Sequence, residues 1–145
     1  MRQLKDTKPA PQIPYSENGI QDFIEKELKQ YQGKSYYCKA LGVNVSVTRK
    51  SVEETSYNCR FNRKAAELAL QLPYIIGHAK IEKLRLPTKS IRQTKYFRFT
   101  EIATLTCNVR RKGIARLVVG FRDNGEVVEY SVTNCQTNKT SQFID

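Results

Sequence analysis

A small set of side chains in this 145-residue chain has the chemistry that metal-independent cleavage of RNA requires. Such cleavage uses a base that takes the 2′-hydroxyl proton, an acid that protonates the leaving 5′-oxygen, and a cation that stabilises charge on the phosphate. Glu129 is the candidate base, and Arg98 or Arg116 is the candidate cation. His78 is the candidate acid, with Tyr130 as an alternative. The competing interpretation is that these residues are structural, on the solvated side of a sheet or at a helix end.

A second set of side chains is basic and could bind phosphates. Arg49 and Lys50 precede a predicted helix start at Ser51, where free backbone N–H groups and two cations favour an anion. Arg60 and Lys64, with Arg63 between them, form another cluster nearby in the sequence. The remaining members lie in a predicted turn or at the strand end beside one: Arg110, Arg111, Lys112 and Arg122. The alternative interpretation of each cluster is that it is ordinary solvated surface.

The charge of the chain favours a polyanionic partner. Lys and Arg number 25 against 14 Asp and Glu, which gives a net charge of +11. Between residues 80 and 122 the only acidic side chains are Glu82 and Glu101, and much of this region has the pattern of β-strands. A basic sheet attracts phosphates, so nucleic acid, RNA in preference to DNA, is the expected partner. The alternative is that the charge serves solubility alone.

Several functional classes are excluded by what the sequence lacks. It contains no P-loop motif, no H-E-x-x-H, no G-x-S-x-G and a single histidine, so we expect neither a metal site nor a cofactor. No apolar run reaches the ~18 residues of a membrane-spanning helix, and the N-terminus lacks the apolar region of a signal peptide. We therefore expect a cytoplasmic protein without a membrane partner, in which the four cysteines remain thiols.

The first half of the chain predicts helices around one hairpin. Residues 1–15 are rich in proline and form the expected leader. Apolar residues at helical spacing predict a helix from Ser16 or Asn18 towards Gly33. Residues 36–48 predict a strand or hairpin broken at Gly42. Further helices are predicted from Ser51, with Glu54 completing a capping box, from Asn62, and from Pro73.

The second half predicts an antiparallel meander. A basic loop containing Pro87 precedes three expected strands, at residues 96–110, 114–122 and 126–133, and a polar tail follows at 134–145. Asn124 and Gly125 favour a type I′ turn between the last two strands. In the third strand the alternation places Val128, Tyr130 and Val132 on the core face and Glu129 on the polar face. The expected fold is a single α+β domain at 16–133, with N-terminal helices packed on the meander.

The order of segments also resembles a known family. Five segments carry the resemblance: VSVTRKSV at 45–52, LPYIIGHA at 72–79, YFRF at 96–99, ARLVV at 115–119 and VEY at 128–130. Together they resemble domains attached to large polyvalent proteins of phages and conjugative elements, which lie close to nuclease-like domains of the barnase, EndoU, colicin and RelE kind. The resemblance covers residues 33–133. It implies helices followed by an antiparallel sheet, and a metal-independent ribonuclease as the activity.

Two positions depart from the pattern of that family. Where a histidine often follows the first strand–helix unit, this chain has the segment 57–60, YNCR. Where the closing strand often carries a Tyr-x-His step, Tyr130 is followed by Ser131 and Val132. These departures favour the alternative of a non-catalytic module, which binds nucleic acid or a protein partner from the same mobile element.

Overall fold

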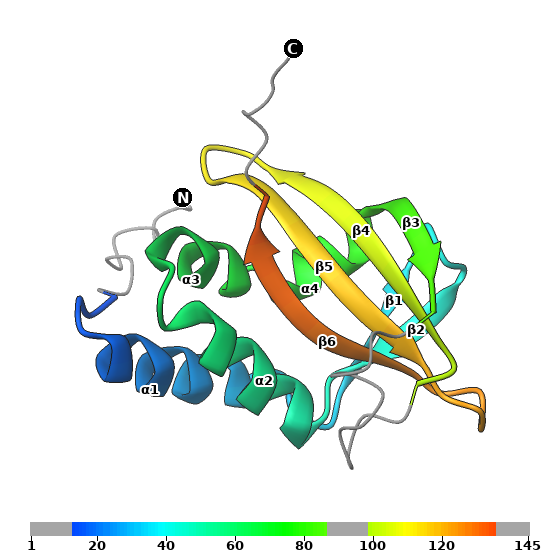
Figure 1. The fold of residues 1–145 in the computed structure, drawn as a ribbon, viewed down its shortest axis with the longest axis horizontal. Coiled ribbons are helices and arrows are strands. Elements are labelled where there is room, and N and C mark those ends of the chain that lie inside the picture. Colours follow the sequence, from blue (N-terminus) through cyan, green and yellow to red (C-terminus); the bar gives the residue numbers. More distant parts are fainter. Residues whose placement is uncertain (1–12, 87–98, 136–145) are drawn as a thin grey trace, which may run out of the picture.

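The computed structural model of the chain describes residues 13–86 and 99–135. Its helices lie against a six-stranded sheet with the strand order β1-β2-β6-β5-β4-β3 (Figure 1). A helix, a hairpin, three helices and four strands follow one another along the chain. This order confirms the predicted α+β domain, with helices in the N-terminal part and an antiparallel meander at the C-terminal end. The predicted leader up to residue 12 and the tail from residue 136 lie outside the described residues.

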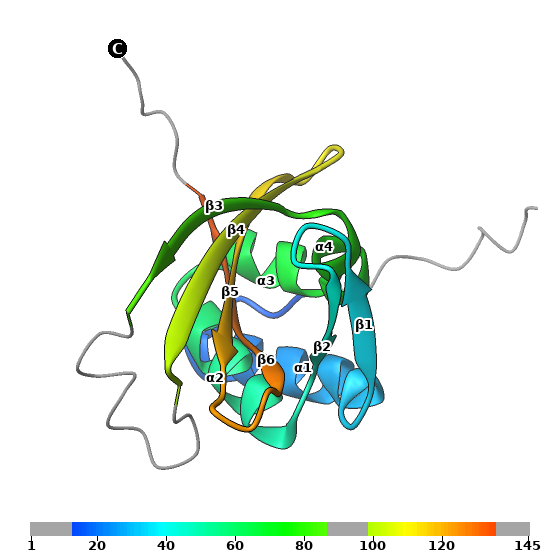
Figure 2. The same ribbon diagram turned by 90° about the vertical axis from the view of Figure 1, so that its right-hand side faces the viewer.

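A hairpin joins the meander to form one mixed sheet. Strands β1 (Ser35–Cys38) and β2 (Val43–Ser46) form the predicted hairpin, with Gly42 in the left-handed region at φ 70°. β2 then pairs in parallel with β6 (Val127–Asn134). This pairing was not predicted, because no local sequence pattern indicates which of two strands far apart in the chain will pair. Figure 2 shows the sheet curling, with β1 and β2 on one side and β3 and β4 on the other.

Helix α1 (Glu17–Leu28) confirms the first predicted helix. The Ser16 side chain caps it by accepting a hydrogen bond from the Gly19 backbone N–H. The predicted apolar stripe faces the core through Ile20, Ile24 and Leu28, which are buried. A short 3₁₀ turn (Lys29–Tyr31) follows, and the chain leaves it at Gly33, whose φ of 86° suits glycine.

Helix α2 (Arg49–Cys59) begins earlier than predicted. Its N-cap is Thr48, whose hydroxyl accepts from the Ser51 backbone N–H, while the Ser51 hydroxyl accepts from the Thr48 backbone N–H. This reciprocal pair corrects the prediction that Ser51 caps the helix with Glu54. A threonine and a serine three residues apart satisfy the two backbone N–H groups that a capping box satisfies. The capping box was therefore predicted correctly, but three residues too late in the chain.

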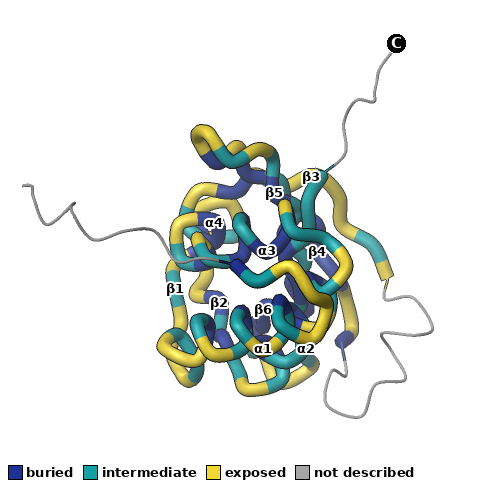
Figure 3. The backbone as a smooth tube through the Cα atoms, turned by 90° about the vertical axis from the view of Figure 1, so that its left-hand side faces the viewer, coloured by how far each residue is buried: buried dark blue, intermediate teal, exposed yellow. Residues whose placement is uncertain are grey.

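Two short helices complete the layer. Helix α3 (Arg63–Ala69) begins where predicted, and the Asn62 side chain caps it by accepting a hydrogen bond from the Ala65 backbone N–H. Helix α4 (Leu72–His78) carries Pro73 in its first turn, where the missing proline N–H costs nothing. Figure 3 shows that the helices turn their buried sides inward and expose their outer sides. Among the helices of the described residues, none has the length and apolar character to cross a membrane.

The meander follows the predicted alternation in its first two strands. β4 (Glu101–Val109) and β5 (Gly113–Phe121) pair antiparallel along their full length. One face of the pair packs on the helices through small and medium apolar residues: Ala103, Leu105, Cys107, Val109, Ala115, Leu117 and Val119. This is the core that the sequence predicts.

The prediction for β6 is confirmed for Val132, which lies in the main core, and is wrong for Val128, Glu129 and Tyr130, because a bulge changes the alternation of the strand. Val118 pairs with Ser131 but Val119 pairs with Glu129, so Tyr130 is the extra residue. Glu129 therefore lies on the helix-covered face and is fully buried. Val128 lies on the opposite face of the sheet, where it packs with a second, small apolar cluster.

That second cluster explains why apolar residues occupy both faces of the meander. Phe99, Ile102 and Val128 are buried together on the face away from the helices, with Tyr130 packed against them. Gly120 allows this arrangement, because any side chain at that position would collide with the Phe99 ring. The alternation used in the sequence analysis assumes one apolar face, and this sheet has two.

Strand β3 (Lys80–Arg85) was predicted as part of a basic loop. It is an edge strand that pairs with β4, and a bulge falls between Ile81 and Lys83. Its side chains are mostly exposed, so its composition resembles that of a loop. The remainder of the predicted loop, with Pro87, lies outside the described residues.

The turn between β5 and β6 also differs from its prediction. A type I′ turn requires positive φ at both Asn124 and Gly125, but only Gly125 has it, at 93°. The Asn124 side chain instead accepts a hydrogen bond from the Glu126 backbone N–H. Asn-Gly thus predicted the hairpin correctly and its turn type incorrectly.

Candidate nucleic-acid interface

Glu129, the candidate base, is enclosed between α2 and β6. Its Oε2 accepts a hydrogen bond of 2.7 Å from the Thr55 hydroxyl, and its Oε1 has no hydrogen-bond partner among the described residues. Burial, with a smaller contribution from Glu54, raises the pKa of Glu129 to about 8, although the Thr55 hydrogen bond acts against the rise. Glu129 is therefore mostly a neutral acid at pH 7. It is fully buried, so a 2′-hydroxyl has no route to it in this conformation.

The groups around Glu129 are held neutral or paired as well. Burial raises the pKa of the Cys59 thiol to about 12, with a further rise from Glu129, so Cys59 carries no thiolate. Tyr130, the alternative acid, donates a hydrogen bond of 3.2 Å to Glu54. Burial and then Glu54 raise the pKa of Tyr130 to about 12. This arrangement fixes α2 on β6 and favours a structural role for the cluster.

Arg116, the candidate cation, lies on the opposite face of the sheet from Glu129. Its guanidinium forms two hydrogen bonds with Glu82 of β3, at 3.2 and 3.3 Å, and a third with the Cys135 sulfur. The guanidinium therefore already has a carboxylate on it, and the sheet itself separates it from Glu129.

The other two catalytic candidates do not complete a site. His78 lies at the exposed end of α4, where its Nδ1 is 2.9 Å from the Tyr74 carbonyl oxygen and its ring stacks on the Tyr74 ring at 4.1 Å. These contacts are those of a structural histidine. Arg98 lies outside the described residues. Among the described residues, no hydrogen bond, ion pair or ring contact joins Arg116, Glu129 and His78 to one another, and their catalytic roles stay predictions.

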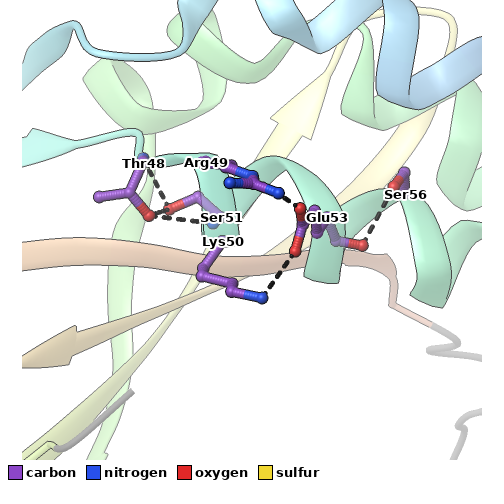
Figure 4. A network of polar contacts seen from close by, with 6 residues as sticks. All are labelled: Thr48, Arg49, Lys50, Ser51, Glu53 and Ser56. Atoms are coloured by element: carbon purple, nitrogen blue, oxygen red, sulfur yellow. Dashed lines mark hydrogen bonds and ion pairs between the residues drawn. The ribbon is translucent and has the colours of Figure 1, made fainter. Parts of the chain in front are cut away.

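The predicted phosphate-binding residues separate into two groups at opposite ends of α2. The first group, which we call the capped end, comprises Arg49, Lys50 and Arg122. Arg49 and Lys50 both form ion pairs with Glu53, at 3.1 and 2.9 Å, beside the Thr48 cap (Figure 4). The hydrogen bond from Lys50 is the main cause that lowers the pKa of Glu53; burial opposes it, and the hydrogen bond from Arg49 lowers the pKa further.

Arg122 belongs to the capped end through the turn between β5 and β6. It forms an ion pair of 2.9 Å with Glu126, and Glu126 lines the same hollow as Arg49. Each cation of the capped end is thus matched with a carboxylate that the protein itself supplies. A phosphate would have to compete with these carboxylates, which weakens the site that the sequence predicted.

The second group, which we call the basic end, comprises Arg60, Arg63, Lys64, Arg110, Arg111 and Lys112. Helix α2 rises by about 1.5 Å per residue, so its 11 residues separate the two ends by roughly 16 Å. At the basic end, the start of α3 lies beside the turn between β4 and β5 (Figure 1). The Lys64 side chain comes within 4.0 Å of the position that a methyl group on Gly113 would take. Arg63 and Lys112 line one common pocket.

Exposed aromatic rings alternate with the cations of the basic end. The Arg60 guanidinium lies 3.4 Å from the Tyr57 ring centroid and 4.0 Å from that of Phe61. Tyr57 and Phe61 are exposed by 48% and 65%. The Arg63 guanidinium lies 4.1 Å from the Tyr15 ring centroid. Cations with exposed rings form the kind of surface on which unpaired bases stack while phosphates are held beside them.

Few carboxylates neutralise the basic end. Among the described residues, its one ion pair joins Lys64 to Glu67 at 3.9 Å, a long contact between partly exposed side chains. Arg63 instead donates to the backbone oxygens of Ile13 and Pro14, at 2.6 Å each. Arg63 thereby keeps its charge and also fixes the start of the described chain against α3.

The aromatic residues of this surface were not predicted from the sequence. Tyr57 and Phe61 alternate with basic residues in the segment 57–64, YNCRFNRK, and that alternation was the available signal. The exposure of the rings could not be foreseen, because aromatic residues near a helix end more often pack inward.

The described residues contain no group of three or more His, Cys, Asp or Glu that could hold a metal ion. All four cysteines are free. No protein-family model matches the chain, and neither a curated protein nor a solved structure matches it.

Proposed function

We propose that this protein is a binding module for single-stranded nucleic acid, with the basic end as its binding surface. The observation that carries the proposal is that Arg63 and Lys64 of α3 lie close to Lys112 and Gly113 at the turn between β4 and β5, next along the chain to Arg60 with its exposed rings. These two basic segments are distant in the sequence. A chain that used its charge for solubility alone would have no need to gather cations and rings in one place.

Single strands suit this surface better than duplexes. Tyr57 and Phe61 offer ring surface to bases, and only an unpaired strand presents the faces of its bases. RNA is favoured over DNA on the resemblance to ribonuclease-like domains alone. The same resemblance supports membership of a phage or conjugative element, with a protein partner from that element as the alternative to RNA.

Binding is proposed in preference to cleavage. Glu129 is buried and hydrogen-bonded to Thr55, and Arg116 lies on the other face of the sheet in an ion pair with Glu82. A ribonuclease site needs its base and its cation on the same phosphodiester. The geometry of these residues therefore favours a module that holds its partner without cutting it.

The test compares the two ends in one binding assay. The basic-end variant carries Arg110→Gln, Arg111→Gln and Lys112→Gln, and the matched control carries Arg49→Gln, Lys50→Gln and Arg122→Gln. Affinity for a fluorescently labelled single-stranded RNA of mixed sequence is measured by anisotropy over a series of salt concentrations. The parent is expected to show a linear fall of log affinity with log salt. The basic-end variant should lower that slope by about 2, because each phosphate contact on a single strand contributes about 0.7.

The control variant removes the same charge and should leave the slope nearly unchanged. Equal losses in the two variants would mean that net charge alone attracts RNA, and would overturn the assignment of the surface. A flat salt response in the parent would favour the protein partner. The same RNA, incubated with the protein in EDTA and run on a denaturing gel, should stay intact, and cleavage products would return the ribonuclease to first place.

A further inference from the structure

A pocket of about 380 Å³ opens beside the basic end. The end of α1 and the turn after it form one side, α3 forms another, and the turn between β4 and β5 closes it. Arg63 and Lys112 belong both to this pocket and to the basic end. A strand whose phosphates lie on the basic end would therefore pass the mouth of the pocket.

The interior of the pocket combines apolar surface with one aromatic ring. Leu28 and Leu70 provide the apolar surface. Tyr31 provides the ring, which is held edge-on against Tyr36 with the centroids 6.1 Å apart. Burial, then Tyr36 and Glu27, raises the pKa of the Tyr31 hydroxyl, which therefore remains a hydrogen-bond donor at neutral pH. Apolar and aromatic side chains with a few polar groups are the usual lining of a site for a small planar ligand.

The polar groups of the pocket include two carboxylates and two amides, one of which is that of Gln30 in the turn after α1. Glu27 comes from α1, Glu67 from α3, and Gln71 from the residue before α4. Glu67 has the long contact with Lys64, and within the described residues Glu27 has no ion pair. With Arg63 and Lys112, two negative charges face two positive charges, so the pocket as a whole is nearly neutral. This balance suits an uncharged, polar ligand better than a phosphate.

We propose that this pocket binds one unstacked nucleobase of a strand held at the basic end, and that it prefers a base with an exocyclic amino group. The inference rests on the proposed function, because the strand that supplies the base must first be held at the basic end, with its phosphates outside the pocket. Binding of a base pulled out of the stack is a common way in which proteins read single-stranded RNA.

The preference follows from hydrogen-bond chemistry. Carboxylates such as Glu27 and Glu67 only accept hydrogen bonds when ionised. Adenine, cytosine and guanine each carry an amino group that donates, whereas uracil presents two carbonyl oxygens on either side of its single ring N–H. A uracil in the pocket would bring carbonyl oxygens towards carboxylates, and the pocket should select against it.

The test uses the four nucleoside monophosphates AMP, CMP, GMP and UMP as separate probes. Each is titrated into the full-length, isotope-labelled protein, and amide shifts are followed by NMR. AMP, CMP and GMP are expected to bind at least about fivefold more tightly than UMP, the low end of hydrogen-bond discrimination between bases. The shifts should centre on residues 27–31 and 67–71.

Two double variants separate recognition of the base from attraction of the phosphate. Glu27→Gln with Glu67→Gln should bring the four affinities to within about twofold of one another, since amides both donate and accept. The matched control, Glu17→Gln with Glu101→Gln, changes the charge equally at exposed positions away from the pocket and should retain the preference. The amide spectrum of each variant confirms that it folds.

Equal affinity of the parent for all four probes, or shifts confined to residues outside the pocket, would overturn this inference. The proposed function would survive that result if single-stranded RNA still bound with a steep salt dependence lost in the basic-end variant. Loss of RNA binding altogether would remove both.

Discussion

The two ends of α2 carry similar basic side chains and differ in what surrounds them. At the capped end, Arg49 and Lys50 meet Glu53, and Arg122 meets Glu126. At the basic end, Arg60 lies between two exposed rings, and Lys112 from the turn between β4 and β5 lines a pocket together with Arg63 of α3. The first arrangement satisfies its cations within the protein, and the second leaves them available to a partner.

This difference shows that a basic cluster in a sequence becomes a binding surface only if the fold withholds acidic partners from it. Glu53 lies on the same helix as Arg49, one turn away, so the ion pair is local. Arg110–Lys112 stand on a turn whose neighbours along the chain supply no carboxylate. The distribution of Asp and Glu therefore separates the two ends better than the distribution of Lys and Arg.

The two ends are held in place by the docking of α2 on β6, at the hydrogen bond between Thr55 and Glu129. This contact offers the largest measurable effect. The folded-state pKa of Glu129 is about 8, above its usual value of 4.5, so ionisation of Glu129 opposes folding. The stability that neutral Glu129 contributes is fully present below about pH 4.5, declines as the pH rises, and is lost once the pH passes about 8.

The Glu129→Gln variant tests this linkage, because glutamine cannot ionise. Urea unfolding of the parent should lose up to about 1.4 kcal/mol per pH unit between those two pKa values, relative to the variant. The variant should equal the parent near pH 4 and exceed it in stability at pH 8.5. Parallel profiles for the two proteins would show that Glu129 is solvated and that α2 is not anchored as described.

Thr55→Val removes the donor to Glu129 and keeps the shape of the side chain. The carboxyl is then left buried without its partner, which should lower the free energy of unfolding by about 1–3 kcal/mol. Ser56→Ala is the matched control on the same helix, because within the described part of the chain the Ser56 hydroxyl bonds only to the Glu53 carbonyl one turn back. A smaller loss from Thr55→Val than from this control would contradict the anchoring role.

Phe61→Ala separates binding from stability at the basic end. Phe61 is 65% exposed, so its removal should change the unfolding free energy by no more than about 0.5 kcal/mol. RNA affinity should nevertheless fall by about 1–3 kcal/mol, the usual contribution of one stacked base. Tyr37→Ala, at a ring 59% exposed on β1, is the control and should leave RNA affinity unchanged. Equal effects of the two substitutions would mean that exposed rings act without regard to position.

The smallest effect is expected at Arg111. Among the described residues it is the one non-glycine residue with positive φ, at 67°. Arg111→Gly should relieve this strain and stabilise the fold by about 0.5–1 kcal/mol, while removing one cation from the basic end. The expected result is a higher urea midpoint together with a salt slope lowered by about 0.7. A lower midpoint would show that the arginine side chain itself stabilises the turn.

Local patterns predicted most of the fold. Ser16 and Asn62 cap the helices that follow them, Pro73 begins a helix, and Gly42 divides a hairpin, because each of these effects acts within one turn of the chain. The candidate site was only partly predictable. Arg60, Lys64 and the residues 110–112 were identified as phosphate-binding candidates, but nothing in the sequence placed them together.

The helices, the hairpin and the buried face of β4 and β5 could be predicted from residue spacing, since the positions of apolar residues fix which face of an element is buried. Which charged residues are buried and which lie together on the surface depends on tertiary contacts. A bulge of one residue in β6 turned Glu129 from the polar face into the core. The packing of α3 beside the turn between β4 and β5 gathered the basic end. Charge acts through space, so its effect depends on distances that the order of residues does not contain.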